Sequence, residues 1–257
     1  IAFVNSEVTG LGKGGEPVLS GYVQFANANA AKTDVGHPLA SFYGYVTDGI
    51  FQTAEEVEAA AFQNEGTAPG DIRFKDLNGD GIIDIQDQTY IGNPTPEITY
   101  GITADMAWKG FEFNVFFAGT EGNDIFKNFV RYDFTYVNRP SSALERWTGP
   151  GTSNNEPRVN LSDPNQNARV SDRFIEDGSY LRLKTLQIGY NLPAAWLSKM
   201  KFEKFKIYMT AQNLITFTKY SGLDPEIGNV GGSLEIGIDR GFYPQARTIL
   251  GGVSLTF

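Results

Sequence analysis

The chain is 257 residues long, contains no cysteine and carries a formal net charge of −9 at pH 7. A nucleic-acid-binding surface requires clustered positive charge, so this balance argues against a nucleic-acid partner. The absence of cysteine removes disulfide frameworks, thiolate metal sites and cysteine nucleophiles. No run approaches the roughly 18 consecutive apolar residues of a transmembrane helix, so a place in a membrane would require β-strands.

The first two predicted strands cover residues 1–8 and 18–25, and a glycine-rich turn at residues 10–15 joins them. The sequence starts inside the first of these strand-like runs, without an initiator methionine or a signal peptide. We therefore expect the chain to be the C-terminal part of a longer protein.

A long excursion follows over about residues 26–96, and it contains one predicted helix at residues 53–63. Thr53 is placed to cap the N-terminus of this helix, and Glu55 and Glu56 in the first turn favour its dipole. The pattern predicts a short helix within a loop.

The same excursion contains the pattern Asp-x-Asn-x-Asp-Gly, which matches a calcium-binding loop with glycine at its sharp turn. Aspartate replaces the usual glutamate at the last ligand position, as in dockerin-like loops, so a lower affinity is expected. The alternative is an Asn-Gly-Asp-Gly turn that is acidic without binding metal. The motif predicts a structural Ca²⁺ on the extracellular side, bound by Asp76, Asn78, Asp80, the Ile82 carbonyl, Asp84 and Asp87.

Residues 98–117 alternate between apolar and polar side chains almost without a break. This period predicts two strands, joined at Lys109-Gly110, with one apolar and one polar face. Each strand has about the ten residues that cross a bilayer when tilted, and Trp108 and Phe111 stand where an interfacial aromatic girdle lies. Taken alone, the hairpin also suits a soluble β-sandwich.

The second half of the chain continues this pattern. The hairpin is expected to extend through Ile125, Phe129 and Tyr132, and a second excursion then runs to about residue 177. A short connection at residues 193–202 and a third excursion at about 218–245 separate the remaining strands. Strands are predicted at residues 180–192, with a bulge near Lys184, at 204–214, and at 248–257, which ends on the aromatic Phe257.

Nine apolar side chains on the alternating strands are expected to face lipid and not a protein core. They are Ile98, Ile102, Met106, Phe113, Val115, Ile207, Met209, Val253 and Leu255.

Short and long connections alternate along the chain. A bacterial outer-membrane barrel has this asymmetry, with short periplasmic turns and longer extracellular loops, whereas a soluble sandwich has no reason to segregate its connections. Counting back from a periplasmic C-terminus puts residues 10–16, 109–110 and 193–202 at the periplasmic rim. The predicted fold is therefore all-β: about seven strands of a transmembrane antiparallel β-barrel, with long extracellular loops and one short loop helix.

Six runs of residues, in order and covering nearly the whole chain, resemble the SusC/RagA family of TonB-dependent outer-membrane transporters. They are residues 41–51, 70–81, 91–96, 177–184, 212–218 and 220–226. The resemblance implies that residues 1–257 form the C-terminal part of a 22-stranded barrel, without the plug domain and the N-terminal barrel strands.

The resemblance also implies import of oligosaccharides or peptides through the bacterial outer membrane, with a SusD-like surface lipoprotein as partner. TonB would power import through the N-terminal region that this chain lacks. A soluble β-rich carbohydrate-binding module with a structural calcium loop is the alternative.

A secreted hydrolase is a weaker third interpretation. His37, the single histidine, lies in a loop context, no carboxylate pair can be assigned a glycosidase geometry, and no phosphate-binding glycine motif is present. We therefore predict that the protein is not an enzyme.

The three excursions are far longer than ordinary loops, at about 70, 60 and 30 residues, and are expected to fold into an ordered extracellular rim that contacts both ligand and lipoprotein. Their aromatic side chains could stack on sugars or pack the loops together, and their arginines could bind a charged ligand or pair with carboxylates. These candidates are Phe42, Tyr43, Tyr45, Phe51, Tyr132, Phe134, Tyr136, Trp147, Phe242 and Tyr243, with Arg131, Arg139, Arg146, Arg169, Arg173 and Arg240. The sequence leaves open whether the cargo is glycan or peptide.

Overall fold

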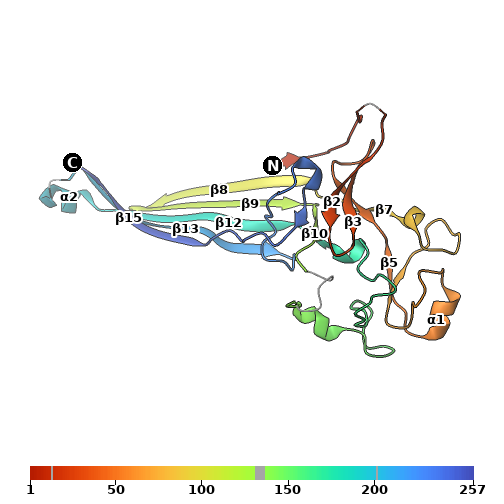
Figure 1. Cartoon of the computed structure of the whole chain (residues 1–257). Helices are drawn as coiled ribbons and strands as arrows, with labels where there is room; N and C mark the ends of the chain where they lie inside the picture. The colour runs from red at the N-terminus through yellow and green to blue at the C-terminus, as the bar shows by residue number, and fades with distance from the viewer. Residues whose placement is uncertain (13, 131–136, 201) are drawn as a thin grey trace.

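The computed structural model describes residues 1–12, 14–130, 137–200 and 202–257, and it is mainly β. A long six-stranded sheet extends away from a region built from the excursions, which we call the loop region (Figure 1). Short connections gather at the far end of the sheet, beside the C-terminus, and the loop region occupies the other end.

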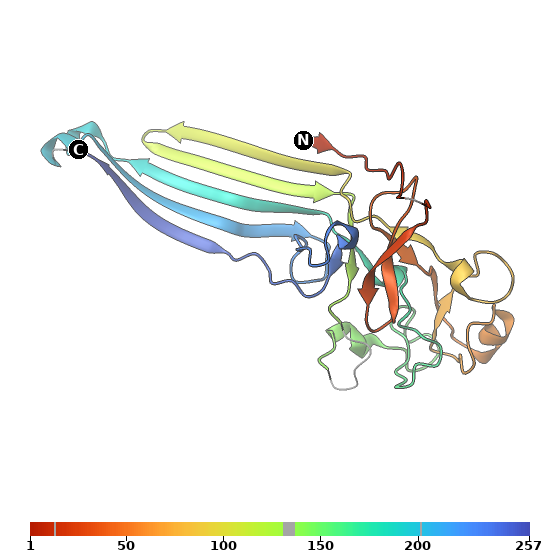
Figure 2. The ribbon, with the colours of Figure 1, turned by 45° about the horizontal axis from the view of Figure 1, so that its top comes forward.

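The long sheet is antiparallel throughout and has the strand order β1-β8-β9-β12-β13-β15 (Figure 2). Within the described residues it is open, with β1 and β15 at its edges. Its strands are β1 (Ala2–Phe3), β8 (Ile98–Trp108), β9 (Phe111–Glu121), β12 (Tyr180–Asn191), β13 (Lys204–Thr218) and β15 (Thr248–Thr256).

The register places all nine predicted apolar side chains on one face of this sheet. Met106 lies opposite Phe113, Phe113 opposite Ile188, and Ile188 opposite Met209. Six of the nine expose between 40% and 60% of their surface instead of meeting in a closed sandwich core: Ile102, Met106, Ile207, Met209, Val253 and Leu255.

The opposite face is polar. Asn114 on β9 donates a hydrogen bond of 2.6 Å to Asp105 Oδ1 on β8, and Lys206 on β13 forms an ion pair with Glu112 on β9. Because successive side chains on a strand point to opposite faces, the two faces differ in chemistry along the whole sheet.

The predicted bulge is confirmed at Lys184. Leu183 pairs with Phe117 and Thr185 pairs with Phe116, so Lys184 is an extra residue in β12. This insertion restores the apolar side chains to the same face on both sides of the bulge.

Two of the three predicted short connections lie at one end of the long sheet. Lys109 and Gly110 turn the chain with positive φ angles of 46° and 90°, as a two-residue hairpin turn requires. Helix α2 (Ala194–Met200) fills the other connection, between β12 and β13.

The first predicted strand joins the long sheet only through Ala2 and Phe3, and the prediction for the second strand is wrong. Residues 18–25 do not join the long sheet: β2 (Val18–Val23) pairs with β3 (Ala28–Thr33) in the loop region, so the turn at residues 10–16 lies there as well. Apolar and polar side chains alternate in β2 as they do in a membrane-spanning strand, but β2 is only six residues long. Its Val23 side chain is buried in the core of the loop region. Six strands, not seven, form the long sheet.

The second strand of the hairpin also ends earlier than predicted. β9 stops at Glu121, and Gly122, with a φ of 82°, turns the chain into a separate short strand that contains Ile125. Phe129 lies outside any strand, and Tyr132 lies outside the described residues.

The loop region contains three small sheets. One has the order β2-β3-β4-β7, with β4 (Ser41–Gly44) and β7 (Thr89–Gly92). The second has the order β11-β10-β14, with β10 (Asp124–Lys127), β11 (Ile175–Asp177) and β14 (Ile238–Asp239), and the third pairs β5 (Thr47–Ile50) with β6 (Ile72–Phe74). Where the structure describes them, the excursions are therefore ordered, as predicted.

All three excursions contribute to one buried core. Phe42 comes from the first excursion, Phe126 and Phe174 from the second, and Ile238 from the third, and all four side chains are at most 2% exposed. A second core, formed by Tyr45, Ile50, Ile72, Phe74 and Ile83, belongs to the first excursion. The first core fixes the three excursions relative to one another.

The predicted loop helix is α1 (Ala54–Ala59), which ends earlier than residue 63. Thr53 caps it as expected, because its hydroxyl oxygen accepts a 3.3 Å hydrogen bond from the backbone N–H of Glu56. Four 3₁₀ helices complete the described helical segments: η1 (Ile85–Asp87), η2 (Ser141–Glu145), η3 (Asp172–Phe174) and η4 (Ser233–Glu235). Among the described residues, no helix combines the length and the apolar character needed to cross a membrane.

A buried ion-pair cluster ties the third excursion to the long sheet. Arg182 on β12 is 2% exposed and binds Asp224, and its Nη1 donates a 2.8 Å hydrogen bond to Glu226 Oε2. Lys184 also pairs with Glu226. Breaking such a buried pair leaves an uncompensated charge, so the cluster holds the loop at a defined position.

We expect the Phe126→Ala substitution to loosen the loop region. Removing a fully buried phenylalanine costs about 3–5 kcal/mol because it leaves a cavity between elements of all three excursions. Limited proteolysis of the full-length protein should cut these loops faster than in the wild type. Leu144→Ala, at a side chain that is 79% exposed, is the matched control and should behave as the wild type. Equal resistance of the two variants would contradict the shared core.

Candidate functional site

The predicted calcium loop is ordered by its own backbone hydrogen bonds. Asp76 accepts bonds from the N–H groups of Gly79, at 2.6 Å, and Gly81, at 2.8 Å, and Asp80 Oδ1 accepts one from Ile82 at 2.9 Å. Gly81 has a φ of 84°, which is the turn conformation that the motif requires of its glycine.

The last two predicted ligands also face backbone groups. Asp84 caps η1 by accepting a 2.7 Å hydrogen bond from Gln86 N–H, and the fully buried Asp87 accepts bonds of 2.8 Å from the N–H groups of Leu77 and Asp84. No group of three or more acidic or histidine side chains within the described residues is placed to hold a metal ion. The predicted ligand side chains are therefore engaged in hydrogen bonds within the loop, and Asn78 Nδ2 donates a further one of 2.9 Å to Asp80 Oδ2.

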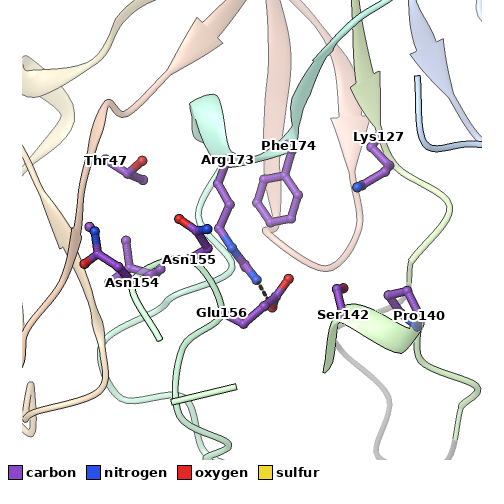
Figure 3. A pocket seen from close by; sticks show the side chains of 11 residues that line it. Thr47, Lys127, Pro140, Ser142, Asn154, Asn155, Glu156, Arg173 and Phe174 are labelled. Atoms are coloured by element: carbon purple, nitrogen blue, oxygen red, sulfur yellow. Dashed lines mark hydrogen bonds and ion pairs between the residues drawn. The ribbon is translucent and has the colours of Figure 1, made fainter. Parts of the chain in front are cut away.

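The loop region contains a polar cavity of about 350 Å³, drawn in Figure 3. We define it by Thr47, Lys127, Ser142, Asn155, Glu156 and Arg173, which come from the first and second excursions. In the middle of the view, Arg173 Nη2 lies 2.6 Å from Glu156 Oε2 in an ion pair. The side chain of Phe174 lies beside this pair and belongs to the first core.

Lys127 is held at the edge of this cavity by Glu176, with which it forms an ion pair. Burial alone would raise the pKa of Glu176, but hydrogen bonds from Lys127 and from Ser221 outweigh it and lower that pKa below its ordinary value. Glu176 is therefore ionised at neutral pH, and the lysine ammonium stays paired.

A second cavity, of about 320 Å³, adjoins the first and shares the Arg173–Glu156 pair with it. We call it the arginine groove because four arginines line it: Arg139, Arg146, Arg158 and Arg173. Its other charged residues are Glu156 and Asp163, and its apolar residues include Pro157, Val159 and Leu161.

A buried carboxylate fixes Arg158 in this groove. Its Nε and Nη2 donate hydrogen bonds of 2.8 and 2.9 Å to the two oxygens of Asp71, which is fully buried. This bidentate contact raises the pKa of Arg158 above its ordinary value. Asn167 Nδ2 also binds Asp71, at 3.0 Å, so the arginine is anchored to a buried polar network.

Three of the six candidate arginines, Arg139, Arg146 and Arg173, meet in the arginine groove. Arg169 instead lies against the rings of Tyr45 and Phe74, with its guanidinium 5.2 Å from each centroid, and Arg240 pairs with Glu235. Arg131 lies outside the described residues, as do Tyr132, Phe134 and Tyr136.

Most of the described candidate aromatics are structural. Phe42, Tyr45 and Phe51 are buried, Trp147 packs against the second core, and Tyr43 lies beneath the Lys32 ammonium, whereas Tyr243 is 92% exposed. His37 stacks on Tyr90, with ring centroids 3.6 Å apart, which is the structural role expected of it.

Sequence reasoning missed Arg158 and Lys127, which line the two cavities. Each occurs as a single basic residue in a polar stretch of the chain, and each gains its position from a carboxylate distant in sequence, Asp71 or Glu176. No local pattern signals either contact.

No family model matches the chain. The sequence is, however, similar to those of several receptors. TonB-dependent receptor P3 of Formosa agariphila is 35% identical to this chain over 228 residues, which cover 86% of this chain and 22% of the receptor. SusC of Bacteroides thetaiotaomicron is 30% identical over 233 residues, covering 90% of this chain and 21% of SusC.

The fold is similar to that of a solved structure of the RagAB peptide transporter. The TM-score is 0.74 at 24% identity, over 98% of this chain and 26% of the matched chain. The chain belongs to the SusC/RagA family of TonB-dependent receptors. It spans about a quarter or less of the proteins that it matches.

Family membership confirms two sequence predictions. SusC/RagA receptors reside in the bacterial outer membrane, and they are not enzymes. The two alternative interpretations of the sequence, a soluble carbohydrate-binding module and a secreted hydrolase, are therefore set aside.

Calcium binding by residues 76–87 remains our proposal from the motif. We expect isothermal titration of the full-length receptor with CaCl₂ to give a dissociation constant on the order of 10⁻⁴–10⁻³ M, as in extracellular calcium modules. Asp80→Ala removes a ligand and should abolish the heat of binding. Asp48→Ala, outside the loop, should leave it unchanged. A wild-type receptor that gives no calcium-dependent heat would show that the loop is only an acidic turn.

Proposed function

We propose that the receptor to which this chain contributes imports oligosaccharides or peptides across the outer membrane, together with a SusD-like surface lipoprotein and powered by TonB. The observation that carries the proposal is the similarity to SusC and to TonB-dependent receptor P3 over most of the chain. The RagAB structures, described as those of a peptide transporter and importer, have the same fold over nearly all of it.

Within this proposal, the long sheet is the C-terminal part of a 22-stranded transmembrane barrel. Its main strands have 9 to 15 residues, lengths that span a tilted path through a bilayer. The exposed apolar face would contact lipid, and the polar face would line the lumen. The end with Lys109 and α2 would be periplasmic, and the loop region extracellular.

The loop region supports the proposed lipoprotein partner. It exposes several large apolar side chains that an ordered, soluble surface rarely leaves in water. Leu144, Leu161, Val230 and Tyr243 are each at least 72% exposed. TonB would act through a part of the receptor that this chain does not contain.

The membrane placement is tested by two lysine substitutions in β8. Ile102→Lys puts a charge on the proposed lipid face in the middle of β8, near the bilayer midplane of the proposed barrel, and should destabilise the barrel by about 2–4 kcal/mol. Thr103→Lys, on the polar face of the same strand, is the matched control. We expect less Ile102→Lys protein in the outer membrane and a lost heat-modifiable band on gels. Equal losses in both variants would contradict the assignment of the faces.

Import is tested by deleting the receptor gene. Uptake of labelled peptide and glycan mixtures should fall for one class of cargo and recover when the gene is restored. Co-purification of the receptor should retain a surface lipoprotein, and this partner should be lost when the loops at residues 137–168 are shortened. Unchanged uptake in the deletion strain would refute the proposed function.

A further inference from the structure

We propose that the arginine groove binds the carboxylate of an acidic peptide. The inference rests on the proposed function and narrows its cargo from oligosaccharides or peptides to peptides that carry glutamate, aspartate or a free C-terminus at this position.

The groove differs in charge from the chain as a whole, which carries −9. Four arginines line it against Glu156 and Asp163, and counting the buried Asp71 that holds Arg158 still leaves one guanidinium group in excess. A local excess of guanidinium groups on an acidic protein favours an anionic ligand, because arginine binds carboxylates in a planar, two-pronged geometry.

Arg146 is available to a ligand. It is exposed at the groove, and no hydrogen bond or ion pair joins it to another described residue. Arg158 and Arg173, in contrast, are held by Asp71 and Glu156. The two held arginines form a fixed wall, and Arg146 presents the donors that an incoming carboxylate can use.

The rest of the groove suits a peptide better than a sugar. Sugar rings are commonly bound by stacking on aromatic faces, but the arginine groove is lined by no aromatic residue among those described. Val159 and Leu161 are instead 72% and 81% exposed beside it. Such aliphatic walls match aliphatic side chains of a peptide.

The adjoining polar cavity offers groups for a peptide backbone. The side-chain amide of Asn155 and the hydroxyl of Ser142 line it, and neither makes a hydrogen bond with a described residue. An amide and a hydroxyl can each donate to a carbonyl oxygen and accept from an N–H group. A short extended peptide could therefore place its backbone in the polar cavity and its carboxylate beside Arg146.

The test uses the full-length receptor with its lipoprotein partner in detergent. The probes are a fluorescein-labelled octapeptide of alternating Glu and Leu and its counterpart of alternating Gln and Leu, read by fluorescence anisotropy. We expect the acidic peptide to bind at least tenfold more tightly, and added NaCl to reduce this difference.

Arg146→Ala should weaken binding of the acidic peptide by about tenfold or more and leave the glutamine peptide unaffected, since it removes one charge-assisted contact. Arg146→Lys should restore part of the affinity. Arg247→Ala, at an exposed arginine outside the groove, is the matched control and should bind as the wild type. Arg146 is exposed, so these variants should keep the heat-modifiable mobility of the folded barrel.

Equal binding of the two peptides, or an equal effect of Arg146→Ala on both, would overturn the inference. So would Arg146-dependent binding of an oligogalacturonate in place of the acidic peptide, which would identify a sugar acid as the ligand. In each case the import proposal would survive. It fails instead if deletion of the receptor leaves uptake of every peptide and glycan unchanged.

Discussion

The structure depends on keeping one apolar face continuous across antiparallel strands. The side-chain period of a strand is two, so a slip of one residue would move every apolar side chain of a strand to the polar face. The bulge at Lys184 prevents such a slip: it separates Leu181 and Leu183 from Leu186 and Ile188, which would otherwise point to opposite sides. A single inserted residue thus maintains the difference between the two faces.

This arrangement has a consequence for the excursions. The long strands expose their apolar side chains, so the sheet cannot supply a core on which the loops could pack. The excursions instead build a core from their own residues, with Phe42, Phe126, Phe174 and Ile238 drawn from all three. The polar cavity and the arginine groove are lined by residues of these same excursions, so their shape depends on that shared core.

Local chemistry explains which features were predictable from sequence. Regular alternation identified the hairpin of β8 and β9, a break in phase located the bulge, and the capping chemistry of Thr53 located α1. The same alternation misplaced β2, because a short strand buried in a soluble core has the same period as the start of a spanning strand. Pairing of β10 with β14 joins residues more than one hundred positions apart. The arginine groove likewise depends on a contact distant in sequence, between Arg158 and Asp71, and has no local signature.

Buried charged residues join the long sheet to the third excursion, and their geometry explains why they occur there. Arg182 lies on the polar face of β12, where Thr216 on β13 accepts a 2.8 Å hydrogen bond from its Nε. Asp224 and Glu226 reach it from the third excursion. Apolar side chains at this point could add comparable stability, but their contacts have no fixed direction and would leave the position of the loop less well defined. A fork of guanidinium donors accepts only one arrangement of two carboxylates, so the ion pairs fix the third excursion against β12.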